Sequence, residues 1–105
     1  MDVREAAEFL KVHDNYLILT HKRPDGDTIG CGAGLFELLR AMGKTAWMLP
    51  SLDAGRTLRP YLKGRAAPED YTPDTVVSVD VATVNLLPPN AEPYRDRIDL
   101  AIDHH

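Results

Sequence analysis

Residues 15–27 read NYLILTHKRPDGD, a short apolar run that passes directly into a polar loop. The apolar part, residues 15–20, has too few polar side chains for a strand with one solvated face, so it predicts a strand buried on both faces of a parallel sheet. The polar part, residues 21–27, contains proline and glycine, which interrupt regular structure. The change at residue 21 therefore predicts the point at which a buried strand leaves the sheet.

Helical patterns lie on both sides of this stretch. Val3, Ala6, Ala7 and Leu10 recur at helical spacing, which predicts an amphipathic helix over residues 2–13. Helical spacing resumes over residues 28–42, and Gly43 is placed to end this second helix.

The second helix is apolar around most of its circumference. Its polar residues form one narrow stripe, Glu37, Arg40 and Lys44. The apolar positions are Ile29, Leu35, Phe36, Leu38, Leu39 and Met42. We expect such a helix to be mostly covered by protein.

Small residues punctuate the start of the same helix. Gly30, Gly32 and Gly34 have the wrong spacing for a dinucleotide-binding fingerprint, so we expect them to allow close packing of the helix on the sheet. Cys31, between them, is expected to be a small buried apolar residue.

Three later apolar runs predict three more strands, residues 45–49, 75–79 and 98–102. Prolines and glycines mark residues 51–74 as a connection, with one short helical stretch around residues 56–63, and prolines mark another connection near residues 88–93. Strands separated by crossovers indicate an α/β fold with a doubly wound, mainly parallel sheet and flanking helices. The length of 105 residues fits one domain, residues 1–105.

Composition excludes several classes of protein. With 44% hydrophobic and 27% charged residues the chain is neither disordered nor collagenous. The net charge of −4 excludes nucleic-acid binding by bulk charge alone. The single cysteine excludes an internal disulfide and a thiolate metal cluster. No apolar run approaches a membrane span and the first residues are too polar for a signal peptide, so we expect a cytoplasmic protein without a membrane partner.

Acidic and imidazole side chains follow three of the four predicted strands. In open α/β sheets, ligands bind beyond the carboxyl ends of the strands, so these residues are expected to converge on one site. They are His21, Asp25 and Asp27 after the first strand, Asp80 after the third, and Asp103, His104 and His105 after the fourth.

Each of these residues also has a simpler interpretation. Asp27 suits a helix N-cap, Asp80 a turn, and the final histidines an exposed tail. The string Asp25-Gly26-Asp27-Thr28 also fits the D-x-D-x-T motif of haloacid dehalogenase phosphatases, but there the first aspartate directly follows the strand, whereas four residues intervene here. The joint arrangement of three clusters at one sheet edge favours a shared site.

Carboxylates and imidazoles without thiolates suit Mn²⁺, Mg²⁺ or Co²⁺ better than structural zinc. Two such ions about 3.5–4 Å apart stabilise the attacking and leaving oxygens of phosphoryl transfer and need a carboxylate between them. Asp25 and Asp27 can send one carboxylate to each ion, and Asp80, on the neighbouring strand, is placed to bridge them.

Three segments together resemble the first three motifs of the DHH phosphoesterase superfamily: residues 21–30 (HKRPDGDTIG), 78–82 (SVDVA) and 103–105 (DHH). The first segment is most similar to the branch that contains oligoribonucleases and 3′-phosphoadenosine 5′-phosphate (pAp) phosphatases. The resemblance covers the whole chain, in the family's order and spacing.

The resemblance implies a role for each matching residue. His21 and Asp25 match ligands of one Mn²⁺, Asp27 and His104 match ligands of the second, and Asp80 matches the bridging carboxylate. His105 matches the histidine that faces the substrate phosphate, and Asp103 the acidic residue that supports the imidazoles. In the family, a metal-bridging water or hydroxide attacks phosphorus, and short oligonucleotides or pAp are the substrates of this branch.

The family pattern continues beyond what this sequence contains, with a fourth metal-binding aspartate and a C-terminal substrate-binding domain. We therefore expect the chain to be the N-terminal part of such a domain, inactive by itself. An inert remnant that binds metal without turnover is one alternative. Other activities of the family are another: cyclic dinucleotide phosphodiesterase, family II pyrophosphatase or single-strand exonuclease. The sequence leaves the oligomeric state open.

Overall fold

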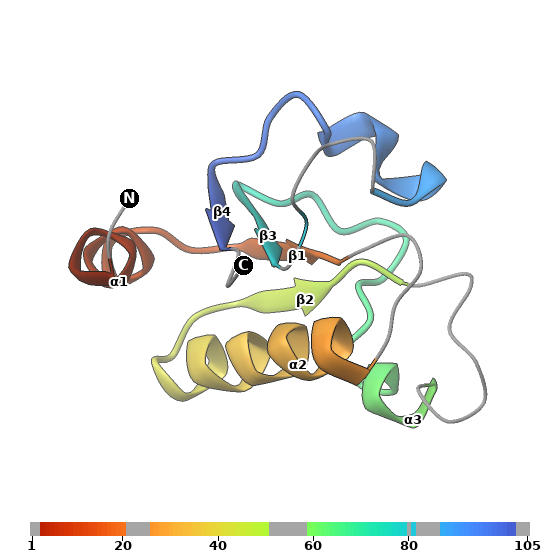
Figure 1. The fold of residues 1–105 in the computed structure, drawn as a ribbon, viewed down its shortest axis with the longest axis horizontal. Coiled ribbons are helices and arrows are strands. Elements are labelled where there is room, and N and C mark those ends of the chain that lie inside the picture. Colours follow the sequence, from red (N-terminus) through yellow and green to blue (C-terminus); the bar gives the residue numbers. More distant parts are fainter. Residues whose placement is uncertain (1–2, 21–25, 51–58, 80, 82–86, 103–105) are drawn as a thin grey trace.

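The computed structural model describes residues 3–20, 26–50, 59–79, 81 and 87–102, without the side chains of residues 3, 26–29, 59 and 61. Its centre is a four-stranded sheet in the order β2-β1-β3-β4, in which all neighbouring strands are parallel. The strands are β1 (Tyr16–Leu19), β2 (Ala46–Met48), β3 (Thr75–Val79) and β4 (Leu100–Ile102). Helical segments flank the sheet (Figure 1), so the predicted α/β class is confirmed.

The two central strands are buried along their whole length. Every residue of β1 and β3 is buried, and the register pairs Tyr16 with Thr75 and Leu19 with Ser78. A strand covered on both faces has no solvated side, which is why these sequences lack the polar alternation of an edge strand.

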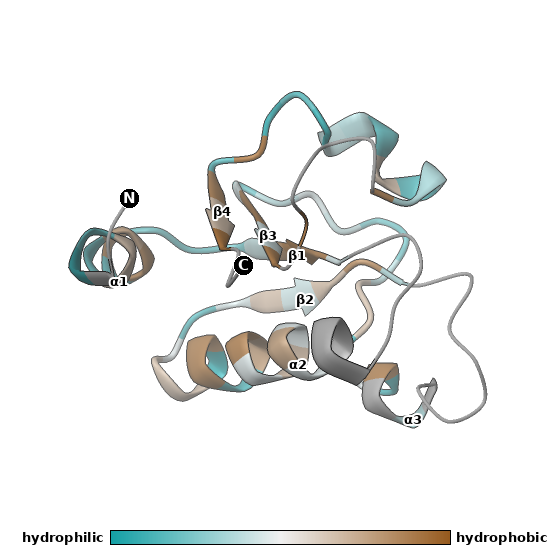
Figure 2. Ribbon diagram, viewed as in Figure 1, coloured by the Kyte–Doolittle hydropathy of each residue, from teal (hydrophilic) through white to brown (hydrophobic). Residues whose placement is uncertain are grey.

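The helix α2 (Gly26–Ala41) covers one face of the sheet and packs closely against β2 (Figure 1). The short helix α3 (Arg59–Leu62) packs against α2. Their apolar side chains join those of the strands in one core, which includes Ile18, Phe36, Leu39, Met48 and Val77. Figure 2 shows hydrophobic residues gathered in the strands and along α2.

The other face of the sheet is covered by η2 (Pro89–Tyr94), a 3-10 helix. A second core forms there and includes Leu17, Leu19, Leu49, Val76 and Ala91. The sequence predicted only a connection at this position. Pro93 lies inside η2, and because proline has no N–H to continue a helical hydrogen-bond pattern, the helix stays short.

The first helix, α1 (Val3–Val12), lies beside the sheet at the start of β1 (Figure 1). Side chains bind three of its last carbonyl groups, which lack partners within the helix. His13 Nδ1 lies 2.8 Å from the carbonyl oxygen of Phe9, and the hydroxyl of Tyr16 donates to that of Leu10 at 2.7 Å. Lys44 Nζ donates to the carbonyl of Lys11 at 2.8 Å. The Tyr16 bond joins the end of α1 to β1, and the Lys44 bond joins it to the segment before β2.

Two expectations for α2 are wrong. Leu38 is 52% exposed and Met42 is 38% exposed, so the helix is not mostly covered, and Cys31 is exposed rather than buried. The reason is helical geometry, because positions 31, 38 and 42 share one side of a helix. The sheet covers the side centred on Gly32, to which the buried Phe36 and Leu39 belong, and Leu35 lies at its border with the exposed side.

Only one of the three clustered glycines lies against the sheet. A β carbon on Gly32 would lie within van der Waals distance of three side chains, whereas one on Gly30 or Gly34 would meet nothing within 4 Å. The expectation of close packing is therefore confirmed for Gly32 and wrong for the other two.

Candidate metal centre

The carboxyl ends of β1, β3 and β4 lie at one edge of the sheet. These three strands are neighbours and parallel, and the register pairs Leu19 with Ser78 and Val79 with Ile102. Each strand therefore ends within about one residue of the same level. In parallel α/β sheets this edge is where ligands bind.

The sequence enters a candidate motif directly after each of these ends. His21 follows Thr20, Asp80 follows Val79, and Asp103 follows Ile102. The structure thus brings together the last described residue before each motif. Six of the seven predicted site residues lie outside the described residues: His21, Asp25, Asp80, Asp103, His104 and His105.

Asp27 is the one predicted ligand whose backbone is described. We expected it in the loop before the helix, but α2 begins at Gly26, so Asp27 lies in the first turn. This boundary has a physical basis, because the positive end of the helix dipole favours an acidic residue in the first turn. The side chain of Asp27 lies outside the described part of the chain.

Gly32 places the amino-terminal half of α2 close to the same edge. The side chains nearest to the position that a β carbon on Gly32 would take belong to Thr20, Met48 and Val79, which lie at the ends of β1, β2 and β3. The helix that begins beside Asp27 is thus held against the three strand ends.

The donor set suits hard divalent cations. The seven candidate residues supply four carboxylates and three imidazoles and no thiolate, a combination that fits Mn²⁺, Mg²⁺ or Co²⁺. Among the residues that the structure describes, no group of three or more His, Cys, Asp or Glu side chains is suitable for a metal ion. The candidate motifs therefore have no competing metal site in the described part of the chain.

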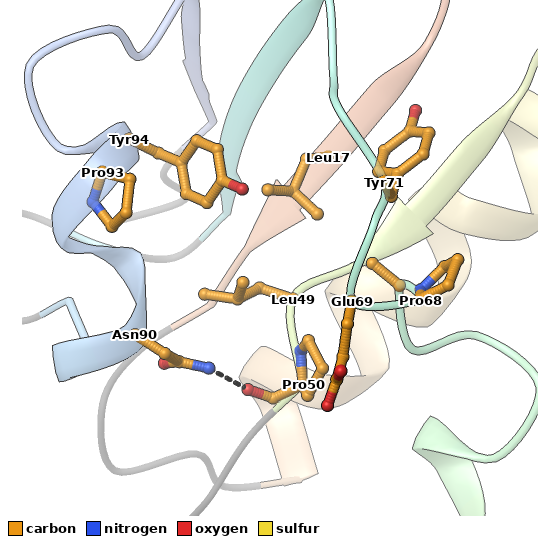
Figure 3. A pocket seen from close by; sticks show the side chains of 10 residues that line it. Leu17, Leu49, Pro50, Pro68, Glu69, Tyr71, Asn90, Pro93 and Tyr94 are labelled. Carbon is orange, nitrogen blue, oxygen red and sulfur yellow. Dashed lines mark hydrogen bonds between the residues drawn. The ribbon is translucent and has the colours of Figure 1, made fainter.

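A cavity of about 440 Å³ opens on the η2 side of the sheet (Figure 3). Its walls are mainly apolar or aromatic and include Leu17, Leu49, Tyr71 and Tyr94. Asn90 Nδ2 donates to the carbonyl of Pro50 at 2.7 Å, while Asn90 Oδ1 is closed to solvent and has no partner in the described structure. Glu69 is the one carboxylate among the described residues that line this cavity, so they do not form a set of metal ligands. The sequence alone does not indicate this cavity, because its lining comes from several separate segments.

Shifted pKa values occur at the opposite end of β1. The backbone N–H groups of Thr45 and Asn15 donate to Asp14 Oδ1, each at 2.8 Å, and lower the pKa of that carboxyl. Burial, with the nearby charge of Asp14, raises the pKa of Tyr16 to about 12 and contributes in the same way to a pKa of about 12 for Tyr71. These groups belong to the structural hydrogen bonds around the start of β1, so their shifts do not mark the candidate centre.

The fold and its carboxyl edge define an α/β protein with a parallel sheet and ligand-type side chains following three strands. A family model described as "DHH family, N-terminal domain" matches residues 15–105, and the chain belongs to this family.

Two relatives match nearly the whole chain. It is 36% identical over 110 residues to the bifunctional oligoribonuclease and PAP phosphatase NrnA of Thermus thermophilus. The match covers 98% of this chain and 32% of that protein. It is 31% identical over 107 residues to an uncharacterized protein of Methanocaldococcus jannaschii, covering 96% of this chain and 32% of that protein. The chain therefore spans about a third of the length of these relatives.

No helix in the described part of the chain is long and apolar enough to cross a membrane.

Proposed function

We propose that this chain is the metal-binding part of a phosphoesterase that hydrolyses short oligonucleotides or pAp. The observation that carries the proposal is the common edge formed by the ends of β1, β3 and β4, from which the sequence continues into three motifs rich in Asp and His. Membership of the DHH family supports the reaction class. The similarity to the Thermus thermophilus oligoribonuclease and PAP phosphatase supports the substrate class.

The proposed ligand set serves two cations, with Mn²⁺ as the first choice. His21 and Asp25 would hold one ion, Asp27 and His104 would hold the other, and Asp80 would serve both. When bound, such ions neutralise phosphate charge and lower the pKa of water. His105 would face the substrate phosphate, and Asp103 would support the imidazoles.

Bound cations would also supply positive charge for the substrate. The net charge of the chain is −4, so its bulk charge does not attract a phosphoester. The donor set holds that charge where the strands end. With three protein ligands available for each ion, we expect the isolated chain to bind metal weakly, the second ion least well, and to show no significant hydrolysis.

The proposal is tested with a chimera in which this chain replaces the matching third of the Thermus thermophilus relative. The chimera should release AMP from pAp and mononucleotides from a short oligoribonucleotide when Mn²⁺ is present. Asp80→Ala should lower kcat by orders of magnitude, since one carboxylate serves both ions. Asp70→Ala removes an exposed carboxylate elsewhere on the chain and should leave kcat unchanged.

Two results would contradict parts of this proposal. Near-normal turnover in the Asp80→Ala chimera would remove Asp80 from the mechanism. Cleavage of pyrophosphate alone would leave the family assignment intact and refute the substrate class.

A further inference from the structure

Gly32 is the point at which α2 comes closest to the ends of the strands. A β carbon on Gly32 would lie 2.6 Å from Met48 Cε, 3.2 Å from Thr20 Cγ2 and 3.7 Å from Val79 Cγ2. Carbon atoms in ordinary contact are about 3.5–4.0 Å apart. A β carbon at position 32 would therefore need the flexible Met48 methyl group to move aside and the contact with Thr20 to open by a few tenths of an ångström.

The neighbours of Gly32 directly precede two of the candidate motifs. Thr20 is followed by His21, and Val79 is followed by Asp80. Asp27 lies five residues before Gly32 on the same helix, about 7.5 Å along its axis at the usual rise of an α-helix. The contact at Gly32 thus lies between the helix that carries Asp27 and the strands that lead to His21 and Asp80.

We propose that Gly32 is a positioning residue for the metal centre, an inference that rests on the proposed function. Its missing side chain lets α2 lie directly on Thr20, so that the ligand on the helix and the ligands after the strands are close enough to share two cations. An added β carbon would push the helix away from the strand ends. Because a helix is stiff, the first turn would move with it.

Thr20 is the neighbour least able to make room. It is 4% exposed, and the two substituents on its β carbon restrict its rotation. Met48 has a long unbranched side chain and can move its methyl group aside. The displacement caused by a side chain at position 32 therefore falls on α2 itself.

Gly34 provides a matched control on the same helix. A β carbon there meets nothing within 4 Å. Gly34→Ala and Gly32→Ala make the same chemical change and give the same gain in helix propensity. The two variants differ in the contact with the strand ends.

The experiment measures Mn²⁺ binding to the full 105-residue chain by the loss of the free-ion EPR signal, at a temperature where each variant is folded by circular dichroism. We expect Gly32→Ala to weaken Mn²⁺ binding at least tenfold and Gly34→Ala to change it less than twofold. Thr20→Ser removes Cγ2 and keeps the hydroxyl, so the double variant Gly32→Ala/Thr20→Ser should recover much of the affinity relative to Thr20→Ser alone.

If Gly32 had a purely structural role, Gly32→Ala would unfold at a lower temperature but bind Mn²⁺ with unchanged affinity. That result would overturn this inference and leave the proposed function intact. Absence of Mn²⁺ binding by the unaltered chain would overturn the inference together with the metal-binding part of the proposed function. If Gly32→Ala does not fold, Gly32→Ala/Met48→Leu removes the closest clash and keeps the contact with Thr20. That variant should still bind Mn²⁺ at least several-fold more weakly than Met48→Leu, and equal affinity would overturn the inference.

Discussion

Tyr16→Phe is expected to destabilise the protein by breaking the attachment of α1 to the sheet. Tyr16 is 0% exposed, and its hydroxyl donates a 2.7 Å hydrogen bond to the carbonyl of Leu10 in the last turn of α1. That carbonyl has no partner within the helix, because the last four carbonyl groups of an α-helix lie beyond its hydrogen-bonding pattern. The substitution leaves it without the hydroxyl donor in a buried position.

The expected loss follows from burial. Leaving a buried acceptor without a donor costs about 1–3 kcal/mol. In a domain of this size each kcal/mol lowers the melting temperature by roughly 4–8 °C. Lys44→Met also removes a donor from the end of α1, but the bond of Lys44 to the carbonyl of Lys11 is exposed, so water replaces it and the loss should stay within about 0.5 kcal/mol.

Urea unfolding at neutral pH, followed by circular dichroism, measures both variants against the unaltered chain. We expect a clear loss of stability for Tyr16→Phe and almost none for Lys44→Met. A loss below about 0.5 kcal/mol for Tyr16→Phe, or equal losses for the two variants, would refute the claim that burial of this hydrogen bond stabilises the attachment.

Three further predictions concern pH and the faces of α2. Burial, followed by the charge of Asp14, raises the pKa of Tyr16 to about 12, so the folded state keeps a proton that the unfolded state loses above pH 10. The free energy of unfolding should therefore fall as the pH rises from 10 to 12, and it should fall less steeply in Tyr16→Phe. The N–H groups of Thr45 and Asn15 lower the pKa of Asp14, so the ionised carboxyl contributes to folding stability above pH 3.8, and this contribution is lost as the pH falls through the lower pKa of the folded state. Asp14→Asn should therefore flatten the acid side of a plot of urea midpoint against pH, and an unchanged acid side would contradict the assignment. On α2, Leu39→Ala should cost about 2–5 kcal/mol in urea unfolding because Leu39 is fully buried, whereas Leu38→Ala should cost far less, and similar losses would show that the exposed face is covered in solution.

The strands were predictable because buried strands consist almost entirely of apolar residues. β3 covers the whole of the expected run, residues 75–79, and β1 and β2 each lose one residue at either end. β4 begins two residues later than expected, at Leu100. The side chain of Asp99 accepts a hydrogen bond from the N–H of Val76, and the side chain of Ile98 packs against the second core. Both residues therefore contact the rest of the fold without belonging to the strand.

The faces of α2 could not be predicted, because exposure depends on which elements pack against a helix. The apolar side chains of Leu38 and Met42 suggested a covering layer, and none of the described residues supplies one for them. The role of Gly32 was hidden for the same reason. Three glycines in alternate positions look equivalent in sequence, and only the placement of Thr20 and Met48 across from one of them separates it from the others.

The candidate centre was predicted from the order of residue types along the chain. Polar residues directly after buried strands are enough to identify one edge of a parallel sheet, and the arrangement of β1, β3 and β4 confirms that these strands end together. The start of α2 at Gly26, which places Asp27 in a helix rather than a loop, was not predictable, because helix boundaries depend on contacts as well as propensity.

The most direct test of the metal centre is the effect of Mn²⁺ on the backbone amide resonances of the ¹⁵N-labelled chain. Paramagnetic Mn²⁺ bound where we propose should broaden the resonances of Thr20, Val81 and Ile102, at the carboxyl edge, before those of Tyr16 and Thr75, at the amino ends of their strands. Asp80→Ala should remove this selective broadening at the same Mn²⁺ concentration. Equal broadening at both edges, or selective broadening that survives in Asp80→Ala, would contradict a metal centre that depends on Asp80.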